Sequence, residues 1–420
     1  MKLKISYHWL TTTIKIFLFP IALFGYGIIS SSVQDASTSR STTIPYRLVV
    51  FILSILVILL GTNINSYECR NGNYYWGKIK ISSILIAIIF TVAYSFRLLF
   101  DIGYNIFLIR DSNEYLLNWF GICLIPGITF LFLDLKSSKK YLYLSWIFLA
   151  IASVLALPLI FQGQISKTFV EQGRLAGEAL NPISLGHQGG SLLLISLYIL
   201  LNREFPKNRV AKIAYIFSLV LGLSLLIFAA SRGPIIAIIA CVSLLLISLQ
   251  HQGVNTFKIF GIIVIVGIFA NIIFSFALDS GSSLIERFLS TLDENEFDNS
   301  RFVQRPELYQ KAIELIAEHP IFGYGLEVPN LGYPHNLILE AFLATGLLGG
   351  SLFLIIYIYA VIKAIGIIMS KNNSWSWLGL LFIQHAIGNM FSGNLYASST
   401  FWYLLFAILG LKKIDKLVKI

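Results

Sequence analysis

Residues 228–237 read FAASRGPIIA and join two apolar runs, residues 210–230 and 233–250. Each run is long enough to span a lipid bilayer, which takes roughly 17 to 25 predominantly apolar residues. Gly233 and Pro234 are typical of a tight turn. The stretch therefore predicts a helical hairpin that crosses a membrane twice.

The rest of the chain repeats this pattern. Of its 420 residues, 56% are hydrophobic and 12% are charged, whereas about a quarter of the residues of a soluble domain are charged. We expect an all-α polytopic membrane protein with about twelve transmembrane helices. Their expected ranges are 9–30, 47–64, 81–100, 116–134, 141–162, 186–202, 210–230, 233–250, 258–279, 336–368, 375–391 and 397–411.

The basic residues predict the orientation of these helices. Lysines gather in every second connection, and cytoplasmic loops carry the excess of Lys and Arg. Both termini are therefore expected in the cytoplasm. The net charge of +10 follows mostly from this topology, and no nucleic-acid partner is expected. The opposite loops hold little lysine but several arginines, namely Arg40, Arg110, Arg174, Arg232, Arg287, Arg301 and Arg305.

The expected organisation has three parts. Residues 1–279 hold the first nine transmembrane helices and an external loop at 163–185. Residues 280–334 form one large external loop with a short amphipathic helix, PELYQKAIELIAEHP. Residues 335–420 hold the last three transmembrane helices. Long loops of this kind are commonly functional.

Two arginine sites are candidates for binding an anion. Arg232 lies at the bilayer edge, where a guanidinium is costly without a partner or water; the alternative is that its side chain simply reaches the interface. Arg301 and Arg305 lie beside the start of the loop helix, and a helix N-terminus favours phosphate. The alternative for this pair is a solvated surface position.

The stretch LGYPHNLILE at 331–340 supplies a candidate base. His335 and Asn336 precede an apolar helix that carries Glu340 about one turn later. A position near a helix N-terminus favours the neutral imidazole that a general base requires. Glu340 either orients His335 or has a packing or capping role, and both readings stay open.

The external loop before residue 186 reads GRLAGEALNPISLGHQGG from residue 173. Its glycines and proline indicate irregular backbone, which at membrane depth is tolerated only beside a cavity. Arg174 is a further anion-binding candidate. Glu178, Asn181 and His187 are interpreted as solvated loop or helix-start residues.

Together these residues predict an external cavity with several arginines and one base. Arginine suits bidentate recognition of phosphate, so a lipid diphosphate is the expected ligand. The chain has no Asp-rich motif and no His/Cys cluster, so we expect no metal and no cofactor.

Three motifs in this order resemble the superfamily of O-antigen ligases and O-antigen polymerases. They are SRG at 231–233, RPELYQKAIELIAEHPIFGYG at 305–325 and PHNLILEAFLATGLLGG at 334–350, and RLAGEALNP at 174–182 is similar to an earlier loop of that family. The resemblance implies a membrane-embedded glycosyltransferase of GT-C type in the bacterial inner membrane. It also implies an active site that faces the periplasm.

By this resemblance, the donor is an undecaprenyl diphosphate-linked oligosaccharide or polysaccharide and the acceptor is a glycolipid. Arg232 and Arg305, and less closely Arg301 and Arg174, would bind the diphosphate, with His335 as the catalytic residue and Asn336 and Glu340 in support. The expected reaction is metal-independent and inverting.

The resemblance leaves the acceptor open. A polymerase in O-antigen or exopolysaccharide synthesis is slightly favoured over a ligase that transfers the glycan to lipid A core in lipopolysaccharide biosynthesis. Other polysaccharide-assembly proteins are expected partners. A transporter of lipid-linked glycans is a less favoured alternative, because it gives His335 no task.

Overall fold

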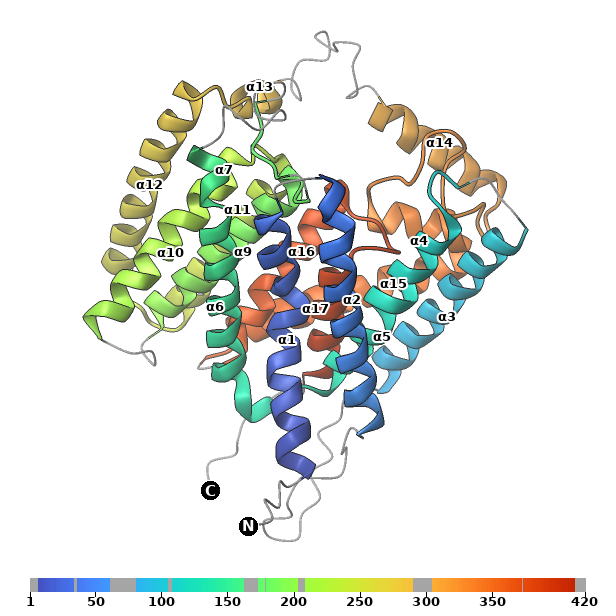
Figure 1. Cartoon of the computed structure of the whole chain (residues 1–420), viewed down its shortest axis with the longest axis horizontal. Coiled ribbons are helices and arrows are strands. Elements are labelled where there is room, and N and C mark those ends of the chain that lie inside the picture. Colours follow the sequence, from blue (N-terminus) through green and yellow to red (C-terminus); the bar gives the residue numbers. More distant parts are fainter. Residues whose placement is uncertain are drawn as a thin grey trace.

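The computed structural model describes residues 7–33, 36–60, 81–104, 108–161, 173–177, 179–202, 208–289, 304–371 and 373–411. These residues are almost entirely helical and contain no β-strand (Figure 1). Ten helices within them are long and apolar enough to cross a bilayer. The chain is therefore an all-α polytopic membrane protein, as its sequence predicts.

Most helices of the first half run close to their predicted ranges, but α2 begins well before the predicted span at 47–64, and residues 61–64 lie outside the described residues. They are α1 (Tyr7–Ser32), α2 (Ala36–Leu59), α3 (Ile81–Gly103), α4 (Ser112–Leu116), η1 (Leu117–Leu124), α5 (Ile125–Thr129), η2 (Phe130–Phe132), η3 (Leu135–Ser137), α6 (Ser138–Leu155), α7 (Leu157–Phe161) and α9 (Pro182–Leu201).

The second half holds the helices that carry most of the candidate residues. They are α10 (Arg209–Phe228), α11 (Arg232–His251), α12 (Thr256–Asp279), α13 (Leu284–Leu289), α14 (Gln304–Glu318), α15 (Leu337–Met369), α16 (Ser376–Ser392) and α17 (Ser399–Gly410).

The last two predicted spans differ from the others in length and surroundings. α16 has 17 residues and α17 has 12, and neither is among the ten segments of the described residues that are long and apolar enough to cross a bilayer. α16 packs against α9, α11, α15 and α17. Phe401 to Leu409 of α17 are all buried. These two helices form the interior of the bundle, whereas α12 exposes Ile265, Ile268 and Ile272 at its outer side.

The predicted span at 116–134 is built from several short pieces. Residues 117–124 form a π-helix that leads into Pro126. Proline has no N–H to donate to the carbonyl four residues earlier, which is that of Ile122. The hydroxyl of Tyr403 donates to this carbonyl instead. The irregular turn thus joins η1 to α17.

α15 is one predicted span but two helical pieces, because Gly346 has φ 63° and ψ −161°. Residues 320–325 lie beside this break and satisfy the backbone groups that it leaves. The N–H of Tyr324 donates to Leu343 O at 2.8 Å, and the N–H of Leu347 donates to Pro320 O at 2.7 Å. A Cβ at Gly346 would lie 2.3 Å from Ile321 O, so the contact requires glycine.

The amphipathic helix predicted in the large loop is confirmed as α14, which begins at Gln304 and ends at Glu318. Its apolar face packs on the first piece of α15. Leu308, Ala312 and Leu315 of α14 form one small apolar cluster with Val328 and with Leu343 of α15. α13 and α14 lie at the upper end of the molecule in Figure 1, whereas α1 begins at the lower end.

Candidate functional site

His335 lies directly before the N-terminus of α15, as the sequence predicts. Its backbone has φ 57°, a left-handed conformation that is uncommon for a residue other than glycine. The imidazole is half-buried and packs against the Tyr333 ring, with the centroids 4.3 Å apart. Strained backbone of this kind persists only where the surroundings fix it, and it is frequent at functional sites.

Asn336 is the N-cap of α15. Its side-chain oxygen accepts hydrogen bonds from the N–H groups of Ile338 and Leu339, both at 3.1 Å, which satisfies two of the donors that a helix start leaves open. Its amide nitrogen donates to Met390 O at 3.2 Å. Asn336 therefore fixes the start of α15 and ties it to α16.

Arg232 is the first residue of α11. Its guanidinium donates to the backbone oxygen of Arg287, in α13, at 3.1 Å. The turn before it contains Ala230 with φ 46°. The predicted hairpin is therefore present, but its turn lies at residues 229–231, and Gly233 and Pro234 belong to the first turn of α11. The hairpin brings Arg232 to the segment that carries Arg287.

Arg174 lies in an irregular segment that is held from both sides. The N–H of Ser283, just before α13, donates to Gly173 O at 3.0 Å, and the N–H of Leu175 donates to Phe228 O, at the end of α10, at 2.9 Å. These bonds hold the segment between α13 and the turn that leads into Arg232. Three arginine-bearing segments therefore meet, and they come from three separate parts of the chain.

The end of α16 joins this arginine cluster (Arg174, Arg232 and Arg287) to the base. A Cβ at Gly233, next to Arg232, would lie 3.3 Å from the Phe391 Cβ. Asn336, next to His335, bonds to Met390. Met390 and Phe391, which are adjacent in α16, thus contact the starts of α15 and α11 respectively.

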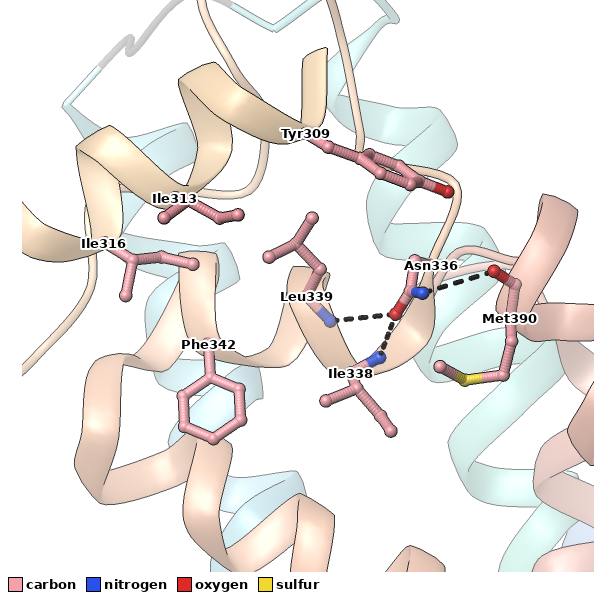
Figure 2. A pocket seen from close by; sticks show the side chains of 8 residues that line it. All are labelled: Tyr309, Ile313, Ile316, Asn336, Ile338, Leu339, Phe342 and Met390. Carbon is pink, nitrogen blue, oxygen red and sulfur yellow. Dashed lines mark hydrogen bonds between the residues drawn. The ribbon is translucent and has the colours of Figure 1, made fainter. Parts of the chain in front are cut away.

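An apolar groove of about 340 Å³ opens beside Asn336 (Figure 2). Tyr309, Ile313 and Ile316 of α14 line one side. Ile338, Leu339 and Phe342 of α15 line the other, and Met390 closes the end next to Asn336. The groove runs from Asn336 between α14 and α15.

Glu340 is fully buried, and its two oxygens have donors from distant elements. The Tyr94 hydroxyl donates to one at 3.3 Å and the Leu395 N–H donates to the other at 2.9 Å. These contacts fit the packing alternative, because they join α15 to α3 and to the segment between α16 and α17. Neither of these two hydrogen bonds involves His335.

The remaining predicted residues are placed only in part. Arg305 is the second residue of α14, and only its backbone is described. Arg301 and Glu178 lie outside the described residues. Asn181 is the N-cap of α9 and accepts from Ser184 N–H at 2.8 Å, as a helix-start residue should.

The interpretation of His187 as a solvated residue is wrong. It is 9% exposed and lies inside α9, where its ring stacks on His385 of α16 with the centroids 4.9 Å apart. A Cβ on Gly388 would lie 2.1 Å from Cε1 of His187. Glycine at 388 thus admits the imidazole against α16, a long-range contact that local composition does not reveal.

Sequence reasoning also missed Arg287 and the end of α16. Arg287 is recognisable in sequence only as an external arginine, since its bond to Arg232 spans 55 residues. The signal at α16 is its polarity, because the apolar span ends in GNMFSGNLYAS at 388–398. Asparagine, serine and glycine so close to a bilayer edge indicate backbone that needs side-chain partners.

The fold and this site define a polytopic membrane protein in which the loop helix α14 packs on the first piece of α15, beside Asn336. Residues 217–354 match the family model described as O-antigen ligase. The match includes Arg232, α14 and the His335–Asn336 pair. This part of the chain is therefore similar to O-antigen ligases, which supports the resemblance to the O-antigen ligase and polymerase superfamily. No curated protein matches the sequence.

Proposed function

We propose that this protein moves a glycan from an undecaprenyl diphosphate carrier to a sugar hydroxyl at the periplasmic face of a bacterial inner membrane. Polymerisation of lipid-linked repeat units is the favoured reaction. Transfer to lipid A core, the ligase reaction, is the alternative, because both use the same donor. Both termini of the chain would be cytoplasmic.

One observation carries the proposal. The arginine cluster and His335 approach the same turn of α16, through Gly233 and Asn336. Transfer of a glycan from a diphosphate carrier needs this combination, because a base must reach the acceptor while cations hold the diphosphate leaving group.

The chemistry then follows from the residue types. His335 takes the proton of an acceptor hydroxyl, and that oxygen forms a bond to the anomeric carbon. The bond from this carbon to the diphosphate oxygen breaks, and Arg232, with Arg174, Arg301 and Arg305, stabilises the charge on the departing diphosphate. Attack from the opposite face inverts the anomeric carbon.

The apolar groove supports a lipid substrate. It begins at Asn336 and runs between α14 and α15, so a polyprenyl chain in it would have its polar end beside His335. Apolar lining with a few polar groups at one end is the usual composition of a lipid or cofactor site.

The test is an assay of the purified protein with undecaprenyl diphosphate-linked repeat units, with and without lipid A core. We expect a ladder of repeats from the wild type and none from His335→Ala. Transfer only when core is present would favour the ligase. No product in either assay would contradict an enzyme and favour transport of the lipid-linked glycan.

The same assay tests independence from metal. Since arginine side chains would neutralise the diphosphate, EDTA is expected to leave turnover unchanged. Loss of product with EDTA, and its recovery with a divalent cation, would contradict this part of the proposal.

A further inference from the structure

Tyr333, against which the His335 imidazole packs, belongs to a closed ring of four residues. Tyr333 packs on Tyr396, Tyr396 packs on Tyr115, and Tyr115 bonds to Glu327. A tight turn of the backbone links Glu327 back to Tyr333. The members come from the segment before α15, the segment after α16 and α4, so the ring joins three parts of the molecule.

Glu327 anchors the ring. It is 7% exposed, and burial of a carboxylate is costly unless hydrogen bonds satisfy its oxygens. The Ile109 N–H donates to one oxygen at 2.9 Å, and the Tyr115 hydroxyl donates to the other. The preceding residue is fixed as well, because the Leu326 N–H donates to Asp101 at 2.9 Å.

A tight turn brings Glu327 and Tyr333 together. The N–H of Val328 donates to Gly332 O at 2.9 Å, and the N–H of Gly332 donates to Val328 O at 3.0 Å. The residues on either side of this closed turn, 327 and 333, must therefore lie close to each other. Anchoring Glu327 fixes the backbone from which the Tyr333 ring projects.

Aromatic contacts close the ring. The Tyr333 ring meets Tyr396 edge-on with centroids 6.0 Å apart, and Tyr396 packs on Tyr115 at 4.5 Å. Such pairs contribute beyond the area that they bury. Burial raises the pKa of Tyr333, against a hydrogen bond from Asn394 that lowers it, so this phenol stays neutral near pH 7. A neutral ring is thus held against the His335 imidazole.

We infer that Glu327 and Tyr115 are positioning residues that hold the Tyr333 ring in place and, through it, fix the His335 imidazole for proton transfer. This inference rests on the proposed function, because it takes His335 as the base. Since a displacement of about 1 Å can cost roughly 100-fold in rate, loss of the anchor should reduce turnover without any change in the substrate-binding arginines.

The test compares Glu327→Ala, Glu327→Gln and Tyr115→Phe. The first readout is the rate at which diethyl pyrocarbonate modifies His335, followed by mass spectrometry of its peptide, which requires no catalysis. The second is the kinetics of the purified, folded protein. Matched controls are Tyr104→Phe, at a side chain that is 72% exposed, and Glu314→Ala, at an exposed pair with Lys311.

We expect faster modification of His335 in Glu327→Ala and Tyr115→Phe, with kcat lower by about 10- to 100-fold and the KM for the donor unchanged. Glu327→Gln should stay near wild type, because an amide oxygen can accept from Ile109 while the amide nitrogen donates to the Tyr115 oxygen. The controls should match the wild type in both readouts.

Modification at the wild-type rate in both variants would overturn the inference, as would faster modification with unchanged kcat. If Glu327→Ala does not fold, Tyr115→Phe alone decides, since it keeps the ring and removes only the hydroxyl. Failure of the proposed function is separate, because it would appear as no product from the wild type or as full activity in His335→Ala, whatever the modification rates of the anchor variants are.

Discussion

Arg232 is held by a specific bond at the start of α11, since its guanidinium reaches the Arg287 carbonyl. A planar fork can keep that bond and still offer donors to a phosphate, whereas an ammonium is a compact point charge. We predict that Arg232→Lys lowers kcat by roughly 100-fold, because it loses donors aimed at the leaving group. The measurement is donor turnover by the purified protein.

Arg209→Lys is the control for this change, since Arg209 is exposed at the opposite end of α10. It should retain wild-type turnover. Full activity of Arg232→Lys would mean that charge alone suffices at this position and that bidentate binding is not used.

Individual residues differ in how far their sequence context predicts them. The position of His335 at a helix start follows from Pro334 and the apolar run after Asn336. Its left-handed backbone does not, because the contacts around it involve Tyr396, far along the chain. Glu340 stayed ambiguous for the same reason, since its partner Tyr94 lies 246 residues away.

At the scale of the element, α15 is defined by its break at Gly346. With φ 63° and ψ −161°, this backbone is open essentially to glycine alone. We predict that Gly346→Ala destabilises the protein by about 1–3 kcal/mol from backbone strain, and by more from the clash with Ile321 O. Thermal unfolding of the detergent-solubilised protein is the measurement.

Gly366→Ala gives the matched comparison within the same helix. A Cβ there meets nothing within 4 Å, and alanine is the better helix former by about 1 kcal/mol. Its unfolding temperature should equal or exceed that of the wild type. Equal unfolding temperatures for Gly346→Ala and the wild type would show that the break tolerates a side chain.

Helices whose apolar residues recur at a regular spacing were predictable from the sequence, and irregular segments were not. Leu308, Ala312 and Leu315 recur at helical spacing, so α14 and its buried face follow from the sequence. The Ile122 carbonyl in the π-helix before Pro126 accepts from the Tyr403 hydroxyl, which is 281 residues away, so no local pattern indicates this contact. A single apolar run likewise gives no sign that residues 320–325 divide α15.

At the scale of the whole molecule, orientation in the membrane is the prediction to test. We expect Gln310→Cys, exposed on α14, to react with a membrane-impermeant maleimide in intact spheroplasts, and Lys136→Cys, exposed before α6, to react only after lysis. A Cys69→Ser background suits the experiment, because Cys123 and Cys241 are buried. The reverse labelling pattern would contradict a periplasmic site.

The assembly of the site was the least predictable level. The sequence indicates which arginines are external, but the arginine cluster forms because 173–177, α11 and α13 bond to one another. Its connection to His335 runs through residues 388–391 of α16, which lie outside the matched domain. Long-range contacts of this kind have no counterpart in hydropathy or spacing.

The division of α15 at Gly346 has a geometric consequence. Residues 320–325 bond to both pieces of α15, through Leu343 O before the break and the Leu347 N–H after it. α14 ends directly before this segment and packs on the first piece through a shared apolar cluster. The loop helix is therefore attached to both pieces of α15, and its position over the apolar groove depends on the break at Gly346.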